Sequence, residues 1–321
     1  MRAIRIDRFG GPEVMQLEDV PSPSPGPRQL LVDVAFAGVN YRDVYEREGS
    51  YGGTPPLTLG AEGAGTVAAV GPEVTEFAKD DRVAWAAAPG SYAEQVLVDA
   101  DRAVPVPEAV GLELAASSLL QGMTAQYLCT ATYPIEAGET ALVHATAGGV
   151  GLLLTQLVKL RGGRVIGTTS TSEKEEVARA AGADEVIRYE GFADRVRELT
   201  DGDGVSVVYD GVGRATFEDS LVALRTRGFL VVYGAASGPP PALEPQRLMS
   251  GGSLYVTRPS LVHYTRTRGE LLDRARDVFD WIASGQLEIR IGGRYPLEKA
   301  HAALEDLTAR RTSGKLLLVV R

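Results

Sequence analysis

The sequence predicts an α/β protein in which a doubly wound parallel sheet is inserted into a mainly β domain. Three observations lead to this fold class. Residues 1–120 consist of short apolar segments between glycines and prolines. From about residue 123, strand-like and helix-like segments alternate. Within this second region lies the stretch ALVHATAGGVG (141–151), in which an apolar run leads into a glycine turn ahead of a helix.

The first 120 residues predict β-strands joined by tight turns. The loop SPSPGP (22–27) is expected on the surface. Segments of this length and rhythm are typical of strands. The expected strands are LLVDVAFAGV, GAGTVAAVG, DRVAWAA and AEQVLVD.

The middle of the chain predicts a parallel sheet that helices cover on both faces, because apolar β-branched strands alternate with helices. The expected strands are TALVHA, RVIGTTS, DEVIRY, VSVVYDGV and FLVVYG, and the expected helices are GGVGLLLTQLVKLRG and SEKEEVARAAG. The chain continues with a turn-rich segment (236–245), a strand-like segment SLYVTRPSL (253–261), two amphipathic helices (268–287 and 296–309) and a last strand, GKLLLVV.

Composition excludes several classes of protein. The 321 residues carry 42 acidic and 33 basic side chains, a formal charge of −9 without a long basic run, so we expect no nucleic-acid partner. The single cysteine, Cys129, excludes an intrachain disulfide and is expected to be a buried small hydrophobe. Neither a signal-peptide pattern nor a membrane-spanning run is present, so we expect a cytoplasmic protein that does not bind membranes.

The glycine turn predicts a dinucleotide-binding site. Gly148 leaves room for a pyrophosphate, Gly151 allows close packing of helix and strand, and Gly149 opens a helix whose N–H groups face the phosphates. Thr146 occupies the place of the usual first glycine, so the pattern is TxGxxG. A glycine-rich turn that binds nothing is the alternative.

The end of the next strand predicts NADPH as the dinucleotide. An NAD site carries a carboxylate there, whereas this chain has Thr168, Thr169 and Ser170, followed by Lys174. Hydroxyl groups and a cation suit a 2′-phosphate. A solvated lysine at the start of a helix, flanked by two glutamates, is the alternative.

Several segments together resemble the zinc-free quinone oxidoreductases of the medium-chain dehydrogenase/reductase superfamily, the group that includes the lens zeta-crystallins. The resemblance covers essentially the whole chain. It implies a GroES-like catalytic domain (1–122), an inserted Rossmann domain that binds NADPH (123–264) and a C-terminal segment that returns to the first domain (265–321). The segments are GVNYRDVYEREGSY, LGAEGAGTVAAVG, DRVAW, LLQGMTAQYL, VHATAGGVG, AAGADEVIRY and SLYVTRPSL.

The resemblance also implies that no catalytic zinc is bound. Asn40, Ala61 and Gln121 stand where the superfamily's alcohol dehydrogenases have Cys, His and Cys, and none of them suits tetrahedral zinc. Glu62 keeps the position beside the missing histidine and is expected to be a structural remnant or a supporting group. The chain's histidines, His144, His263 and His301, have no spacing that could replace these ligands.

Without a metal, the acceptor for hydride must be reactive or polarised by hydrogen bonds, as quinones and activated enones are. The expected donors are Asn40, Tyr45 and Tyr51. The resemblance places Asn40 and Tyr45 beside the nicotinamide, and Tyr51 where related enoyl-thioester reductases carry a tyrosine acid. Packing in the core or at its rim is the alternative for each.

Further cofactor contacts follow from the resemblance alone. Tyr189 is expected to join Lys174 at the 2′-phosphate, and Arg310 to reach that end or the adenosine, with an exposed helix-end arginine as its alternative. Tyr233 to Ala235, with Ser237, are expected near the nicotinamide ribose, and Val256 to Arg258 near the carboxamide. The remaining expected contacts are Thr124, Ala147, Val150 and Gly234.

Three residues or segments have structural interpretations. His144 is expected to be a hydrogen-bonded core residue, and Asp210 a turn-forming residue. The segment 253–261 is expected late in the sheet, where an unpaired edge favours aggregation, so the resemblance implies a homodimer that pairs this edge.

The sequence therefore leaves three functions. The first is an NADPH-dependent quinone reductase that works by hydride or one-electron transfer. The second is an enone or enoyl-thioester reductase on the same scaffold. The third is a dinucleotide-binding accessory protein, crystallin-like or RNA-binding, with little turnover.

Overall fold

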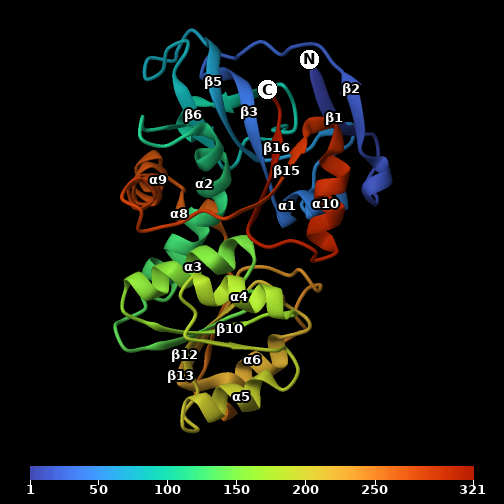
Figure 1. Cartoon of the computed structure of the whole chain (residues 1–321). Helices are drawn as coiled ribbons and strands as arrows, with labels where there is room; N and C mark the ends of the chain where they lie inside the picture. Colours follow the sequence, from blue (N-terminus) through green and yellow to red (C-terminus); the bar gives the residue numbers. More distant parts are fainter. The chain divides into compact units, whose positions relative to one another are not determined.

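The computed structural model describes residues 1–321, which form two compact units. Unit 1 consists of Met1–Met123 and Thr265–Arg321, and unit 2 of Thr124–Tyr264. Both chain ends lie in unit 1 (Figure 1). The first boundary falls within one helix, α2 (Leu112–Tyr127), which a single π-helical turn follows (Leu128–Thr132).

Unit 2 is built on a six-stranded sheet in which every pair of neighbours is parallel. The strand order is β11-β10-β9-β12-β13-β14, so the chain starts in the middle and reverses its winding direction there, which is the Rossmann arrangement. The strands are β9 (Thr140–Val143), β10 (Arg164–Thr168), β11 (Glu185–Ile187), β12 (Val205–Asp210), β13 (Leu224–Val232) and β14 (Tyr255–Thr257). The predicted doubly wound sheet is confirmed.

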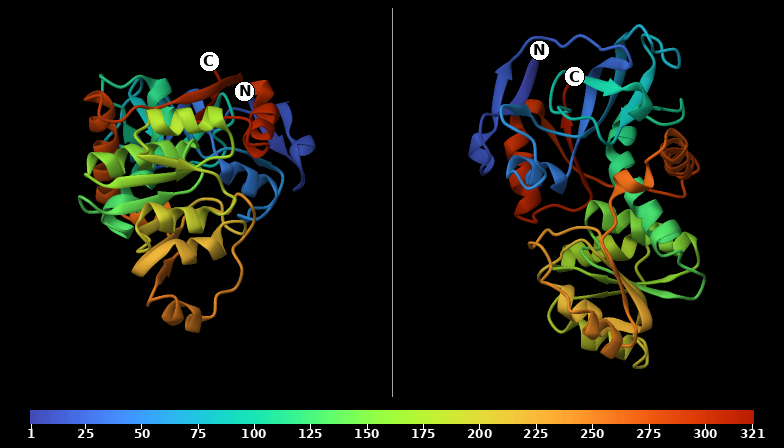
Figure 2. Two further views of the ribbon diagram at one scale, coloured as in Figure 1. Left: turned by 60° about the horizontal axis from the view of Figure 1, so that its bottom comes forward. Right: turned by 180° about the vertical axis from the view of Figure 1, so that it is seen from behind.

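Helices cover both faces of this sheet. Figures 1 and 2 show α3 and α4 on one face and α5 and α6 on the other. Every residue of β12 is accordingly buried, as expected for a parallel strand between two helix layers. The helices of unit 2 are α3 (Gly149–Leu160), α4 (Ser172–Ala180), α5 (Phe192–Leu199), α6 (Phe217–Ala223), α7 (Pro245–Ser250) and α8 (Leu261–Tyr264).

One predicted strand is shorter than expected. Only Tyr255–Thr257 of the segment 253–261 pairs with β13, and Leu261 already belongs to α8. Pro259 explains the early end, because it has no N–H to donate to a sheet. Strand β14 is nevertheless the edge strand that was predicted.

Unit 1 is mainly β. A seven-stranded sheet runs in the order β15-β16-β3-β5-β6-β8, with β7 paired to β3, and a separate sheet has the order β2-β1-β4. All pairs are antiparallel except β15 with β16. The strands are β1 (Arg2–Ile6), β2 (Gln16–Asp19), β3 (Gln29–Val39), β4 (Leu57–Thr58), β5 (Glu62–Val70), β6 (Arg82–Trp85), β7 (Gln95–Asp99), β8 (Val104–Pro105), β15 (Ile291–Pro296) and β16 (Lys315–Val319).

The C-terminal segment completes the core of unit 1. Strand β16 pairs with the end of β3, where Leu316 lies opposite Val39, and side chains of β16 and α10 join the hydrophobic core that the first 120 residues build. This pairing brings Lys315 next to Asn40, which precedes α1. Besides the first part of α2, the helices of unit 1 are α1 (Tyr41–Arg47), α9 (Arg268–Ala283) and α10 (Ala300–Thr308), with 3-10 turns at Pro12–Val14, Ala100–Arg102 and Leu297–Lys299. None of the helices is long and apolar enough to cross a membrane.

Candidate active site

The glycine turn of unit 2 leaves backbone donors available at the start of a helix. Gly148 precedes α3 without a side-chain cap, and the first N–H groups of a helix have no acceptor within it. A Cβ on Gly151 would lie 2.4 Å from the carbonyl oxygen of Ala145, so this position requires glycine. A Cβ on Gly148 would meet only that same oxygen, at 3.0 Å, so the turn is otherwise open beside Gly148. This geometry suits a phosphate group.

Thr146, in place of the usual first glycine, is accommodated by the neighbouring strand. Its hydroxyl donates to the carbonyl oxygen of Val143 at 2.7 Å. A Cβ on Gly167 of β10 would lie 2.5 Å from this hydroxyl oxygen. Gly167 on the neighbouring strand therefore provides the room that the Thr146 side chain needs, and the turn remains closely packed. Ala147 is buried next to it, whereas Val150 is half-buried in the first turn of α3.

A second cation, which sequence analysis missed, lies beside the residues that follow β10. Arg188 follows β11 and donates from Nη1 to the hydroxyl of Thr169 at 2.8 Å and from Nη2 to that of Ser172 at 3.2 Å. It also forms an ion pair with Glu175 at 3.1 Å. The pairing of the two strands explains this contact. Thr168 of β10 lies opposite Ile187 of β11, so the residues that follow the two strands are neighbours.

The hydroxyl-bearing residues after β10 differ in exposure. Thr169 is buried beneath the Arg188 contact, whereas Ser170 is exposed. Lys174 is half-buried in the first turn of α4, and its backbone N–H donates to the hydroxyl of Thr171. The predicted Lys174 and the missed Arg188 thus belong to the segments that follow β10 and β11.

Tyr189 lies at the glycine turn. Its hydroxyl accepts a hydrogen bond from the backbone N–H of Ala145 at 3.1 Å, and its ring stacks on that of His144. His144 is fully buried and bonded to the hydroxyls of Thr168 and Ser220, which confirms the predicted core role. Burial lowers the pKa of His144, so the neutral ring is favoured.

Other predicted cofactor residues of unit 2 follow β12 and β13, at the edge of the sheet where all parallel strands end. Tyr233 and Gly234 come directly after β13, and their N–H groups point to the carbonyl oxygen of Asp210. Ser237 donates to the carbonyl oxygen of Val212 at 2.8 Å. The carboxylate of Asp210 accepts from two backbone N–H groups and a hydroxyl, so its predicted turn-forming role is confirmed.

In unit 1, α1 and the loop after it bring the predicted Tyr45 and Tyr51 together with Tyr41. The rings of Tyr41, Tyr45 and Tyr51 form a row with both centroid separations at 5.4 Å. Tyr51 is 58% exposed, and the guanidinium of Arg42 lies 5.9 Å from its ring centre. Burial raises the pKa of Tyr41, and the charge of Arg310 opposes that rise, which places Arg310 near the same row.

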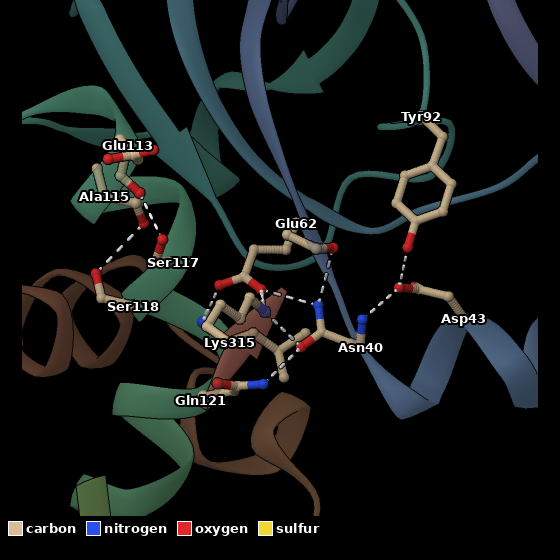
Figure 3. Close-up of polar contacts among 12 residues, drawn as sticks. Asn40, Asp43, Glu62, Tyr92, Glu113, Ala115, Ser117, Ser118, Gln121 and Lys315 are labelled. Atoms are coloured by element: carbon tan, nitrogen blue, oxygen red, sulfur yellow. Dashed lines mark hydrogen bonds and ion pairs between the residues drawn. The ribbon is translucent and has the colours of Figure 1, made fainter. Parts of the chain in front are cut away.

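Asn40 belongs to a buried polar cluster with Glu62, Gln121 and Lys315, here called the amide–ion cluster (Figure 3). The Lys315 ammonium donates to Glu62 Oε2 at 2.5 Å and to Asn40 Oδ1 at 2.8 Å. Asn40 Nδ2 donates to Glu62 Oε2 at 2.8 Å and to the carbonyl oxygen of Gly38 at 3.2 Å. Glu62 Oε1 accepts from the N–H of Leu120 at 2.7 Å. Both N–H bonds of the Asn40 amide are therefore already in use.

The cluster explains why Glu62 is buried and why a glycine, Gly38, lies beside it. A Cβ on Gly38 would lie 2.4 Å from Glu62 Oε2, so glycine makes room for the carboxylate. Gln121 Nε2 approaches Asn40 Oδ1 at 3.4 Å, which joins two of the three positions aligned above with zinc ligands. The chain has no group of three or more His, Cys, Asp or Glu residues that could hold a metal ion. Cys129 lies elsewhere, fully buried, and burial raises the pKa of its thiol to about 12.

Comparisons with known proteins show similarity along the whole chain. Two protein families match: "Alcohol dehydrogenase GroES-like domain" over residues 26–108 and "Zinc-binding dehydrogenase" over residues 149–283. A quinone oxidoreductase from Pseudomonas aeruginosa is 44% identical over 99% of both chains. A mycobacterial protein solved with NADPH is 49% identical over the full length of both chains, with a TM-score of 0.98. The Escherichia coli quinone oxidoreductase solved with NADPH is 40% identical over the same extent, also with a TM-score of 0.98.

Proposed function

Because the chain belongs to the zinc-free quinone oxidoreductases of the medium-chain dehydrogenase/reductase superfamily, we propose that it reduces quinones with NADPH. The observation that carries this proposal is the similarity to quinone oxidoreductases along the entire chain, at 44% and 41% identity for two bacterial relatives. The overall reaction converts a quinone, NADPH and a proton to a hydroquinone and NADP⁺. Transfer as a hydride or as single electrons gives the same products.

Unit 2 supplies groups that fit NADPH. The open glycine turn with the free N–H groups of α3 suits the pyrophosphate, with Gly148, Gly149, Val150 and Gly151 around it. Lys174 and Arg188, with the hydroxyl of Ser170, suit the 2′-phosphate. Thr124, Ala147, Thr169, Tyr189, Tyr233, Gly234, Ser237 and Arg310 remain predicted cofactor contacts.

In unit 1, the proposed roles concern the acceptor. NADPH, when bound, supplies the two electrons of the reduction, and the protein must stabilise the charge that develops on the acceptor oxygen. Tyr45 and Tyr51 offer phenol O–H groups for this purpose, and Tyr51 is accessible. Asn40 has no uncommitted N–H, so its proposed part is to hold neighbouring groups in place.

The first test is the oxidation of NADPH by 1,4-benzoquinone, with NADH, a crotonyl thioester and a chelator in parallel reactions. We expect quinone turnover that prefers NADPH and is unaffected by the chelator. Lys174→Ala and Arg188→Ala should each lower kcat/KM for NADPH by about tenfold, since a charged hydrogen bond contributes roughly 1.5–3 kcal/mol, and should leave NADH almost unchanged.

Arg195→Ala is the matched control, because Arg195 is an exposed arginine of unit 2 that pairs only with Glu198. Equal use of NADH and NADPH by the unmodified protein would contradict the assignment of the 2′-phosphate site. Turnover of the thioester alone would move the acceptor class to enoyl thioesters. NADPH binding without turnover of either acceptor would favour the accessory function.

We further propose a cytoplasmic homodimer that pairs the β14 edges. Strand β14 has no neighbour on its outer side, and Tyr255 on it is 51% exposed and stacks on Phe229 at 4.4 Å. A charge placed on an edge strand opposes pairing. Tyr255→Asp is therefore expected to shift the mass measured by light scattering from dimer to monomer, whereas Val222→Asp, at an equally exposed position on α6, should not. A monomeric unmodified protein would contradict the proposal.

A further inference from the structure

Gln121 is the only side chain of the amide–ion cluster that reaches the surface of unit 1. Asn40 is 3% exposed, Lys315 is 1% exposed and Glu62 is fully buried, whereas Gln121 is half-buried. Its single hydrogen bond within the protein runs from Nε2 to Asn40 Oδ1. One Nε2–H and the carbonyl oxygen Oε1 are therefore available to a ligand.

The ion pair determines which way the Asn40 amide faces. Lys315 requires an acceptor and Glu62 requires a donor, so Asn40 turns Oδ1 to the ammonium and Nδ2 to the carboxylate. The reversed amide would place its NH₂ group against the ammonium and its oxygen against the carboxylate. Since Oδ1 is fixed, Gln121 must approach it with Nε2, as Figure 3 shows, and this turns Oε1 away from Asn40.

We propose that Gln121 is a further catalytic residue that contacts the reacting oxygen of the acceptor. Its uncommitted N–H donates to the carbonyl oxygen of the quinone, and its Oε1 accepts from the hydroxyl of the hydroquinone product. Position 121 aligns, by the resemblance above, with a ligand of the zinc that holds the reacting oxygen in alcohol dehydrogenases. Glu62 and Lys315 are positioning residues that act through Asn40. The inference rests on the proposed function.

The test compares Gln121→Leu with the matched control Gln286→Leu, at an exposed glutamine of unit 1. We expect Gln121→Leu to lower kcat/KM for 1,4-benzoquinone by about tenfold and to weaken binding of 1,4-hydroquinone, measured by calorimetry, by a similar factor. KM for NADPH and the thermal midpoint should stay unchanged. An inactive unmodified protein would defeat the proposed function, whereas an active protein with an unaffected Gln121→Leu variant would defeat only this inference.

The positioning role predicts coupling between these residues. Gln121→Leu should cost tenfold in the unmodified background and less than twofold in a Glu62→Gln/Lys315→Met background, where the ion pair no longer orients the Asn40 amide. Asn40→Ala, which removes Oδ1 and keeps the ion pair, provides a second background with the same expectation if the first does not fold. Equal tenfold losses in these backgrounds would show that Gln121 acts alone and would overturn the positioning role.

Discussion

Replacement of Lys315 by methionine is expected to reduce the free energy of unfolding of unit 1 by about 3–5 kcal/mol, the usual cost of leaving one charge of a buried ion pair without its partner. Glu62 is fully buried and receives the Lys315 ammonium at 2.5 Å, so the variant keeps a carboxylate that no other cation contacts. Trp85 and Trp281 both belong to unit 1, so tryptophan fluorescence during urea unfolding reports this unit alone.

The double variant Glu62→Gln/Lys315→Met is the control for charge. It leaves two uncharged side chains of similar size, and replacing a whole buried ion pair is often close to neutral. We expect it to recover most of the lost stability. A single Lys315→Met variant that unfolds at the urea concentration of the unmodified protein would show that the pair contributes nothing to unit 1.

The contribution of Asp43 to the stability of unit 1 is expected to fall as the pH rises from about 4 to 7. Burial raises the pKa of Asp43 from 3.8 to about 7, and its Oδ1 has no hydrogen-bond partner, although Oδ2 accepts from the Tyr92 hydroxyl at 2.7 Å. The folded state therefore holds a proton that the unfolded state has released. This contribution is complete below pH 4 and is lost through pH 7, and three pKa units correspond to about 4 kcal/mol.

The Asp43→Asn variant cannot titrate at this position, so comparison with it isolates the carboxyl. The difference in free energy of unfolding between the unmodified protein and Asp43→Asn should decline steadily from pH 4 to pH 7 and then level off. A constant difference for Asp43→Asn across this range would contradict the raised pKa.

Local patterns were sufficient to predict the sheet of unit 2 and the glycine turn. Alternation of β-branched strands with helices, and the spacing from Gly148 to Gly151, depend on residues close in sequence. The inward position of Thr168 could not be predicted in this way. Its hydroxyl bonds to His144, because β9 and β10 are adjacent, and only Thr169 and Ser170 remain near the cations.

The missed residues depend on contacts between distant segments. Arg188 reaches Thr169 because β11 pairs with β10, a register that composition does not reveal. In the sequence, nothing distinguishes Lys315 from other lysines. The pairing of β16 with β3 nevertheless brings it into contact with Asn40, which lies 275 positions earlier. The length of the segment 253–261 was overestimated because its apolar residues outweighed Pro259.

The cluster around Lys315 also bears on the order in which the protein can fold during synthesis. Unit 2 is one continuous stretch, so the ribosome delivers all of it before residues 265–321 emerge. Unit 1 cannot be completed before unit 2 has been translated, because β16 and the cation that neutralises Glu62 follow unit 2 in the chain. Until then, the nascent first half of unit 1 carries an unpaired carboxylate and an open sheet edge at β3, both of which the final strand covers at once.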